Sequence, residues 1–316
     1  MTVLPFVCLA IGIILGLLIK ADKFAIIADK VLTVALILLM LAIGVGIGLD
    51  ESIIRNALKI GFNCVLISLC AITFSVFFTV ICEKTVLPLK KLDAQLQYQN
   101  IDTSMVSSNE DESKGSPLVW IMPISVIAGI FLGIQFRSSI NPGIINKCFI
   151  ASLVVLYICV GVSQAKNKEI FVYIKKLGFR ILWLSMTIIV GSLTGGLVSG
   201  LLLGLPLNVS VVSAGGMSFY SVTGAYMTET YGVEIGTYGF IVNIMREVFT
   251  ILLMPILIKI STGSPIAGGA AGDMDTMLAP ITKFVGVRLG LVTLITGTIL
   301  TFVVPILLPI LSYFSF

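Results

Sequence analysis

The C-terminal third of the chain carries acidic side chains inside apolar sequence. Residues 239–258 read GFIVNIMREVFTILLMPILI, which is long enough to cross a bilayer, yet Arg246 and Glu247 lie in its first half. Asp273 and Asp275 follow in a glycine- and alanine-rich segment between two more apolar stretches. A charge near the middle of a membrane helix costs about 2.5–3.5 kcal/mol on insertion scales, so such residues usually face a partner or a water-filled path. We therefore expect Glu247 and Asp275 to line one polar cavity.

These residue types suit the binding of a cation. On a helix, Asn243 and Glu247 share a face because they are four residues apart, whereas Arg246 lies about 100° around the axis. Arg246 is expected to neutralise Asp273 or Asp275; a buried ion pair with a purely structural role is the alternative. The acids outnumber this arginine, which leaves at least one carboxylate for a cation or a proton. Burial favours the protonated carboxyl and an approaching cation favours the carboxylate, so a proton can exchange for a cationic substrate.

A second polar group occupies residues 205–237, where hydroxyl side chains lie among glycines. Such a segment offers ligands for an ammonium group, a carboxylate or a sodium ion. Serine and threonine in membrane helices also hydrogen-bond to their own backbone. A purely local role for these hydroxyls is therefore the alternative to a binding site. The candidate ligands are Ser213, Ser218, Tyr220, Ser221 and Thr223.

Composition places the chain in a membrane. It has 316 residues, of which 57% are apolar and only 11% are charged, and its mean hydropathy is +1.11. Soluble domains carry about 25% charged residues, so this chain cannot cover a surface that faces water. It has no histidine, and any proton relay must therefore use carboxylates. The six cysteines lack metal-ligand spacing. We expect lipid around the chain, no nucleic-acid partner, no metal and no cofactor beyond a coupling H⁺ or Na⁺.

Apolar stretches of about 17–25 residues predict membrane helices. We expect eight of them, over 3–19, 31–49, 60–82, 118–136, 148–165, 178–204, 238–258 and 286–312. Residues 205–237 and 261–283 are too polar and too rich in glycine to be plain spans. They predict re-entrant or discontinuous segments, because irregular backbone at membrane depth needs protein or water to satisfy its polar groups; two long surface loops are the alternative. The sequence thus predicts an all-α polytopic membrane protein.

The distribution of lysine and arginine predicts its orientation. With the N-terminus outside, the loops then inside hold Lys20, Lys23, Lys30, Lys84, Lys90, Lys91, Lys114, Lys166, Lys168, Lys175, Lys176, Arg180, Lys259, Lys283 and Arg288. The loops then outside hold only Arg55, Lys59, Arg137 and Lys147. This positive-inside bias supports eight spans with both termini outside, and Asp50, Glu51, Glu229 and Glu234 are then expected in solvent near the outer surface. The polar stretch 83–117 has no apolar periodicity and predicts a mobile cytoplasmic loop.

The first three predicted helices resemble the next three at an offset of about 117 residues. A three-helix unit repeated in tandem enters the membrane from opposite sides, which makes an inverted repeat of the kind common in secondary transporters. We therefore divide the chain into a first repeat at 1–82, a loop at 83–117, a second repeat at 118–204 and a transport region at 205–316. Alternate glycines from Gly44 to Gly48 predict close helix packing. The matched residues include Gly16 with Gly133, Lys30 with Lys147, Gly44 with Gly161, and Lys59 with Lys176.

Several motifs together resemble the lysine-exporter family of the LysO type. They are Gly216–Gly224 (GMSFYSVTG), Thr228-Glu229, Asn243 with Arg246-Glu247, and Met274-Asp275 followed by Pro280. The resemblance implies export of L-lysine and toxic lysine analogues across the bacterial inner membrane, with Glu247 and Asp275 as the functional acids. The chain departs from the family at Asp273, where a small hydroxyl residue is usual, and at Ser218, where a relative has glycine. The loop 83–117 is a further departure.

From these observations we expect a multi-pass inner-membrane secondary exporter of a cationic amino acid, and not an enzyme. Glu247 and Asp275 would receive the substrate's ammonium groups and exchange them for a proton or another cation by antiport. A sodium-coupled carrier of an anionic or neutral metabolite is one alternative, and an ion channel is another. An intramembrane hydrolase is disfavoured, because the chain has no histidine and no convincing nucleophile with a base. A homodimer stays open.

Overall fold

The computed structural model describes residues 4–19, 22–89, 92–93, 118–137, 141–166, 173–174 and 177–313. Within these ranges every regular element is helical. The chain divides into two compact units. Unit 1 comprises residues 1–61, 117–171 and 224–238, and unit 2 comprises 62–116, 172–223 and 239–316.

Each of the eight apolar ranges predicted from the sequence holds a helix. These helices are α1 (Leu4–Leu18), α2 (Asp22–Leu49), α4 (Ala57–Thr85), α7 (Leu118–Gln135), α8 (Pro142–Lys166), α10 (Leu182–Leu203), α13 (Val233–Ile260) and α16 (Val287–Tyr313). Among the described residues, six of the eight are long and apolar enough to cross a membrane, while α1 and α7 contain shorter apolar stretches. The all-α polytopic membrane fold is therefore confirmed, and the count of eight crossings stays a prediction.

Two boundaries differ from the sequence prediction. Asp50 and Glu51 do not simply end a helix in solvent: Asp50 caps a short helix, α3 (Glu51–Arg55), that the sequence reading missed. The predicted loop 83–117 is ordered at its start, because α4 continues to Thr85 and Leu87, Leu89 and Leu92 are buried. Residues 94–117, the rest of that loop, lie outside the described residues.

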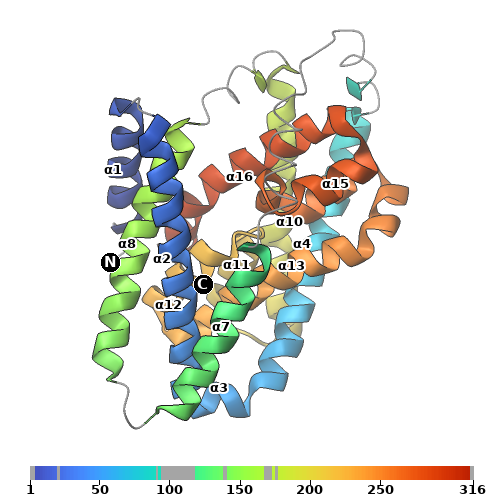
Figure 1. The fold of residues 1–316 in the computed structure, drawn as a ribbon. Helices are drawn as coiled ribbons and strands as arrows, with labels where there is room; N and C mark the ends of the chain where they lie inside the picture. The colour runs from blue at the N-terminus through green and yellow to red at the C-terminus, as the bar shows by residue number, and fades with distance from the viewer. Residues whose placement is uncertain are drawn as a thin grey trace. The chain divides into compact units, whose positions relative to one another are not determined.

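Unit 1 is built from helices that touch backbone to backbone. In it, α1 lies against α8, and α2 lies against both α7 and α8 (Figure 1). A Cβ atom on Gly12 would lie 2.2 Å from the carbonyl oxygen of Ile158, and one on Gly44 would lie 2.3 Å from that of Val126. No side chain fits at these positions, so the predicted role of glycine in close packing is confirmed for Gly44.

The same glycines bear on the predicted repeat. Adding 117 to Gly12 gives Gly129, and adding 117 to Gly44 gives Gly161. In the structure Gly12 contacts Gly161, and Gly44 contacts Gly129. Each contact therefore pairs one glycine of the first repeat with the counterpart of the other glycine in the second repeat. This pattern is expected for two copies of one unit related by a twofold axis. This exchange supports the repeat; its inversion across a membrane stays a prediction.

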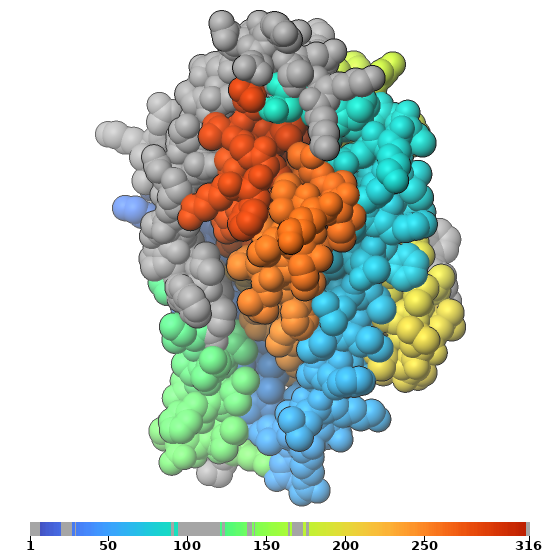
Figure 2. Space-filling view, turned by 90° about the vertical axis from the view of Figure 1, so that its right-hand side faces the viewer, coloured from blue at the N-terminus to red at the C-terminus, as the bar shows by residue number. Residues whose placement is uncertain are grey.

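Unit 2 shows the same relation at its own helix contact. Ser75 of α4 and Ser192 of α10 are 117 residues apart, and their hydroxyl oxygens lie 3.1 Å from each other. A Cβ atom on Gly191 would lie 2.4 Å from the Cα atom of Ser75, so these two helices also touch through their backbones. In Figure 2 the blue and cyan surface of α4 runs beside the orange surface of α13.

Unit 2 also contains broken helices where the sequence predicts irregular segments. The first segment forms α11 (Leu207–Gly215) and then α12 (Tyr220–Tyr231), which continues into unit 1. The second forms α14 (Ser264–Gly269), the 3₁₀ turn η2 (Ala270–Met274) and α15 (Leu278–Val285). At the breaks, Met217, Ser218 and Ala270 have positive φ values of 48°, 73° and 54°. Discontinuous segments are therefore present, and their re-entry into the bilayer stays a prediction.

We expect Gly129→Ala to destabilise the protein by about 1–3 kcal/mol, the usual cost of overpacking a tight contact. The new methyl group would collide with α2, because the Cβ position lies 2.4 Å from the carbonyl oxygen of Leu41. Thermal unfolding in detergent measures the effect.

Gly61→Ala is the matched control, since a Cβ atom on Gly61 meets nothing within 4 Å. Its helix should be unaffected or slightly stabilised, because alanine favours helix over glycine by about 1 kcal/mol. Equal unfolding temperatures for both variants would contradict the close approach of α2 and α7.

Candidate functional site

Asn243 of α13 holds the first chain break. Its side chain is fully buried. The Oδ1 atom accepts a hydrogen bond from the Ser218 amide at 2.7 Å, and Nδ2 donates to the carbonyl oxygens of Ser213 at 2.9 Å and Gly239 at 2.7 Å. The Ser218 amide lies in the turn between α11 and α12, and the Ser213 carbonyl lies in the last turn of α11, where helical hydrogen bonding is interrupted. The Gly239 carbonyl belongs to α13 itself, one turn before Asn243. Asn243 thus joins α13 to the first break.

Arg246, one turn further along α13, holds the second break. Its Nε atom donates to the carbonyl oxygen of Gly268 at 3.0 Å, and Nη2 donates to that of Ala267 at 2.9 Å. Both carbonyls belong to the end of α14, where the helix leaves them without partners. The guanidinium also donates to Ser192 at 2.7 Å and to Ser75 at 3.2 Å.

These contacts change the role expected for Arg246. We expected it to neutralise Asp273 or Asp275, but all the hydrogen bonds found for it reach neutral oxygens. Its side chain is 1% exposed. Four of the five N–H groups of a guanidinium are used in these bonds, so Arg246 supports the backbone. Its charge acts on Asp273 without a hydrogen bond between the two side chains.

The two breaks meet each other. The Ala271 amide of η2 donates to the carbonyl oxygen of Met217 at 2.9 Å, which joins the second break to the first. α16 lies directly against η2, since a Cβ atom on Gly297 would lie 2.3 Å from the Met274 nitrogen. The two breaks and α16 thus form one contact region in unit 2.

Glu247 and Asp275 come together at a threonine beside this contact. The hydroxyl of Thr276 donates to Oε1 of Glu247 at 3.0 Å, and its amide donates to Oδ1 of Asp275 at 2.5 Å. Asp275 is exposed and Glu247 is partly buried. We call these two carboxylates the acid pair. Gly272 makes room for it, because a Cβ atom there would lie 2.8 Å from Oε1 of Glu247.

Thr276 is the residue that the sequence reading missed. The sequence could have indicated Thr276 by its position directly after Asp275, because the residue after an aspartate often hydrogen-bonds to the aspartate side chain. The structure also places Tyr220 within electrostatic range of both acids, with its ring edge-on to Phe240 at 5.8 Å between centroids.

The other candidate hydroxyl residues were predicted either to bind a ligand or to bond to their own helix, and the structure shows that they differ from one another. Thr223 donates to the carbonyl oxygen of Phe219 at 2.8 Å, which is the bond to its own helix that served as the alternative. Ser221 is buried. The Ser218 hydroxyl is buried and has no hydrogen-bond partner. Ser213 contributes its carbonyl oxygen to Asn243.

Asp273 differs from the acid pair. Its side chain is 0% exposed, and neither of its carboxylate oxygens has a hydrogen-bond partner. It lies against the backbone of Gly269, where a Cβ atom would come within 1.9 Å of Oδ1. This acid is therefore sealed from solvent, while Asp275 two residues later is exposed.

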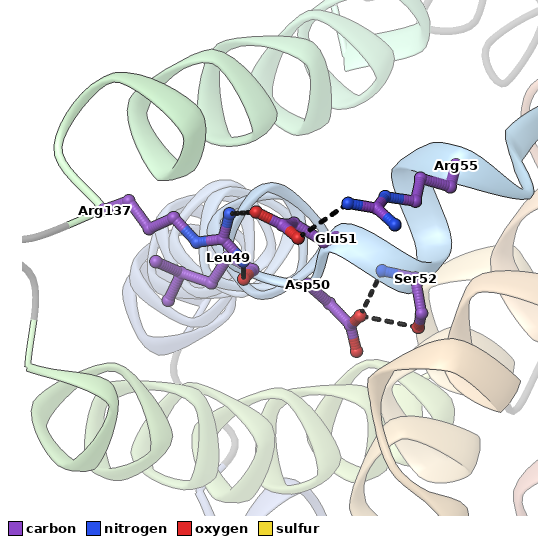
Figure 3. Close-up of polar contacts among 6 residues, drawn as sticks. All are labelled: Leu49, Asp50, Glu51, Ser52, Arg55 and Arg137. Carbon is purple, nitrogen blue, oxygen red and sulfur yellow. Dashed lines mark hydrogen bonds and ion pairs between the residues drawn. The ribbon is translucent and has the colours of Figure 1, made fainter.

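Unit 1 contains a separate cavity of about 610 Å³, which we call the unit 1 cavity. Arg137, at the end of α7, donates to the Glu51 carboxylate and to the carbonyl oxygen of Leu49 (Figure 3). The cavity is lined by Ala42, Ile43, Gly46, Leu49, Asp50, Glu51, Arg137, Ile145, Asn146, Phe149, Ile150, Thr228, Glu229, Gly232 and Val233.

Two of its acids differ in their surroundings. Asp50 accepts hydrogen bonds from the Ser52 hydroxyl at 2.7 Å and the Ser52 amide at 2.9 Å (Figure 3), and the hydroxyl bond above all lowers the pKa of Asp50. Glu229 is partly buried, in contrast to the solvated position expected, whereas Glu234 is exposed as expected.

Broken helices in a multi-pass helical protein are compatible with a transporter, because discontinuous helices are common in transporter folds. A family model described as "Lysine exporter LysO" matches residues 6–94 and 123–312. The chain belongs to this family, which is one of transporters and not of enzymes.

Two relatives accompany this match. "Lysine exporter LysO" of Escherichia coli (strain K12) is 31% identical over 161 residues, which cover 51% of this chain and 54% of that protein. The chain thus spans about half the length of this relative. "Putative lysine exporter" of Haemophilus influenzae (strain ATCC 51907 / DSM 11121 / KW20 / Rd) is 26% identical over 190 residues, which cover 60% of this chain and 96% of that protein. No solved structure matches.

We expect Arg246→Lys to destabilise the protein by about 1–3 kcal/mol or more, because an ammonium cannot reproduce the planar fork and leaves buried oxygens without donors. Chemical or thermal unfolding in detergent measures the change. Arg288→Lys is the matched control: Arg288 pairs with Asp93 at 2.8 Å in a partly exposed position, where such pairs contribute about 0–1 kcal/mol. A similar small effect at both positions would contradict the supporting role of Arg246.

Ser218→Gly should stabilise the protein by about 1 kcal/mol. The backbone at Ser218 has φ 73°, which glycine adopts without strain, and the substitution also removes a buried hydroxyl that has no partner. Ser221→Gly, in the first turn of α12, is the control and should destabilise by about 0.5 kcal/mol. The unfolding temperatures of the two variants should move in opposite directions, and a fall in both would refute strain at the break.

Proposed function

We propose that this chain exports L-lysine and similar cationic amino acids across the bacterial inner membrane. The observation that carries the proposal is the acid pair, in which Glu247 and Asp275 both bond to Thr276. Membership of the family supports it, as do the names of the relatives.

The acid pair suits a cationic ligand because no described residue forms an ion pair with Glu247 or Asp275. Arg246, next to Glu247 in the chain, is occupied by neutral oxygens. A lysine ammonium brings three donors and a positive charge, which two carboxylates can accept. The exposure of Asp275 gives such a ligand access.

Export further requires a driving ion and an orientation. We propose antiport through the intramembrane carboxylates, in which the amino acid leaves while a proton or another cation enters. The chain would cross the membrane eight times with both termini outside, and 205–237 and 261–283 would re-enter it within a transport region at 205–316. The two three-helix repeats, at 1–82 and 118–204, would be inverted relative to each other.

In this orientation the unit 1 cavity opens on the outer side. Asp50, Glu51 and Arg137 belong to segments between predicted spans that then lie outside, and so does Glu229. The cavity volume lies within the range of small-molecule sites, about 300–1,000 Å³. An acidic cavity on that side would give a departing cation a favourable place before release.

Efflux from proteoliposomes loaded with labelled lysine tests the proposal. Glu247→Gln and Asp275→Asn should each slow efflux about 10- to 100-fold, because a hydrogen bond to a charged group contributes about 1.5–3 kcal/mol. Glu234→Gln is the matched control, since Glu234 is an exposed carboxylate on the same helix. Wild-type rates in both acid variants would refute the role of the pair.

The same vesicles separate the proposal from its alternatives. Arginine, ornithine and a dicarboxylate loaded in place of lysine test the substrate class, and an imposed sodium gradient tests the coupling ion. A sodium-driven flux of an anionic or neutral metabolite, or single-channel currents across a planar bilayer, would favour the alternatives and refute lysine export.

A further inference from the structure

The most unusual acid in the described part of the chain is Asp273. It is 0% exposed, and neither carboxylate oxygen has a hydrogen-bond partner. It lies in η2, between the backbone of Gly269 and that of Gly297 on α16. A buried carboxylate without partners is strongly disfavoured, so this group needs a counter-charge, a bound cation or a proton.

The surroundings do not supply a direct counter-charge. The charged groups that act on Asp273 are Arg246, Glu247 and Asp275, and the two acids carry its own sign. The hydrogen bonds of Arg246 all reach neutral oxygens. Of the helices packed against η2, α14 has no charged residue.

The cations of α15 and α16, the other helices packed against η2, form no ion pair with Asp273. Lys283 of α15 is exposed, and Arg288 of α16 is paired with Asp93 at 2.8 Å. Arg246 thus remains the nearby positive charge, and it faces three acids without a hydrogen bond to Asp273.

A metal ion fits this position less well than a proton. Sodium and calcium sites gather several oxygen ligands around one point. No oxygen among the described residues hydrogen-bonds to the Asp273 carboxylate, and the described residues contain no group of three or more His, Cys, Asp or Glu that could hold a metal. A proton needs no such cage, because a protonated carboxyl is neutral.

We propose that Asp273 is the binding site of the coupling proton, separate from the acid pair that receives the substrate; this inference rests on the proposed lysine export. When no substrate is bound, the negative acid pair keeps the proton on Asp273. When a lysine ammonium binds Glu247 and Asp275, the added positive charge favours release of that proton. Lysine and proton then bind alternately, as antiport requires.

The step balances in atoms and charge. The O–H bond of the Asp273 carboxyl breaks, and the proton passes to water that reaches the site when the transport cycle opens it. The carboxylate left behind is stabilised by the charge of Arg246 and by the bound ammonium. When lysine leaves, the carboxylate takes a proton from water again. One positive charge moves in each direction, so the exchange is electrically neutral for a substrate of charge +1.

The test compares wild-type protein with Asp273→Asn, a neutral side chain of the same shape. Both are placed in lysine-loaded vesicles with an acidic outer solution, and a pH dye inside reports proton entry. In the wild type, the proton gradient should speed lysine export and each export should be matched by proton entry. In Asp273→Asn, the acceleration should fall about tenfold or more, within the usual range of coupling between two sites, and the dye signal should disappear.

Asp93→Asn is the matched control, because it removes a carboxylate of unit 2 that pairs with Arg288 outside this site. It should behave as the wild type does. Proton entry coupled to lysine at the wild-type rate in Asp273→Asn would overturn the proposal.

A second measurement does not depend on transport. Infrared difference spectra of the wild type at neutral pH should show the carbonyl stretch of a protonated carboxyl group, which lysine should diminish. The band should be missing in Asp273→Asn, or in Asp273→Ser if the asparagine variant does not fold.

The two proposals can fail separately. Wild-type lysine export without this carboxyl band would overturn the proton site and leave export standing. A carboxyl band without any lysine flux would overturn export and leave Asp273 as a buried proton-binding group with another partner.

Discussion

Buried irregular backbone must find hydrogen-bond partners, and the arrangement of unit 2 depends on how this is achieved. Two helices break inside the unit, and each break leaves amides or carbonyls without helical partners. Asn243 serves the first break and Arg246 serves the second, from successive turns of α13. A single continuous helix therefore fixes both discontinuities, which in turn contact each other through the Ala271 amide and the Met217 carbonyl.

The use of Arg246 for this purpose has a chemical consequence. The four hydrogen bonds found for Arg246 all reach neutral oxygens, so the nearby acids remain able to bind another positive charge. Glu247 and Asp275 are each stabilised by a hydrogen bond from Thr276. The carboxylate oxygens of Asp273 have no hydrogen-bond partner. Had Arg246 paired directly with a carboxylate, the site would have been a closed structural ion pair. The arginine supports the backbone, and the acids remain available for ligands.

The sequence predicts the helices well because hydropathy and length depend only on local residue types. It also predicts the breaks at 205–237 and 261–283, since glycine and polar residues interrupt both segments. It could not predict the partners of Arg246, because Ser75 and Ser192 are separated from it by 171 and 54 residues. The short helix α3 was missed because its capping bond from Ser52 to Asp50 is too local to show in hydropathy.

The predicted repeat would explain why an arginine suits this position in unit 2. Ser75 and Ser192 are 117 residues apart, which is the offset of the predicted repeat, and their hydroxyl oxygens lie 3.1 Å from each other. A twofold relation between the predicted repeats would make these two serines a symmetric pair of acceptors. The planar guanidinium can reach both serines with two of its nitrogens and still donate to the carbonyls of α14, which a lysine ammonium cannot do in one plane. α13 and α14 have no counterpart in the repeats, so Arg246 is the point where the symmetric helices hold the part of the chain that carries the acids.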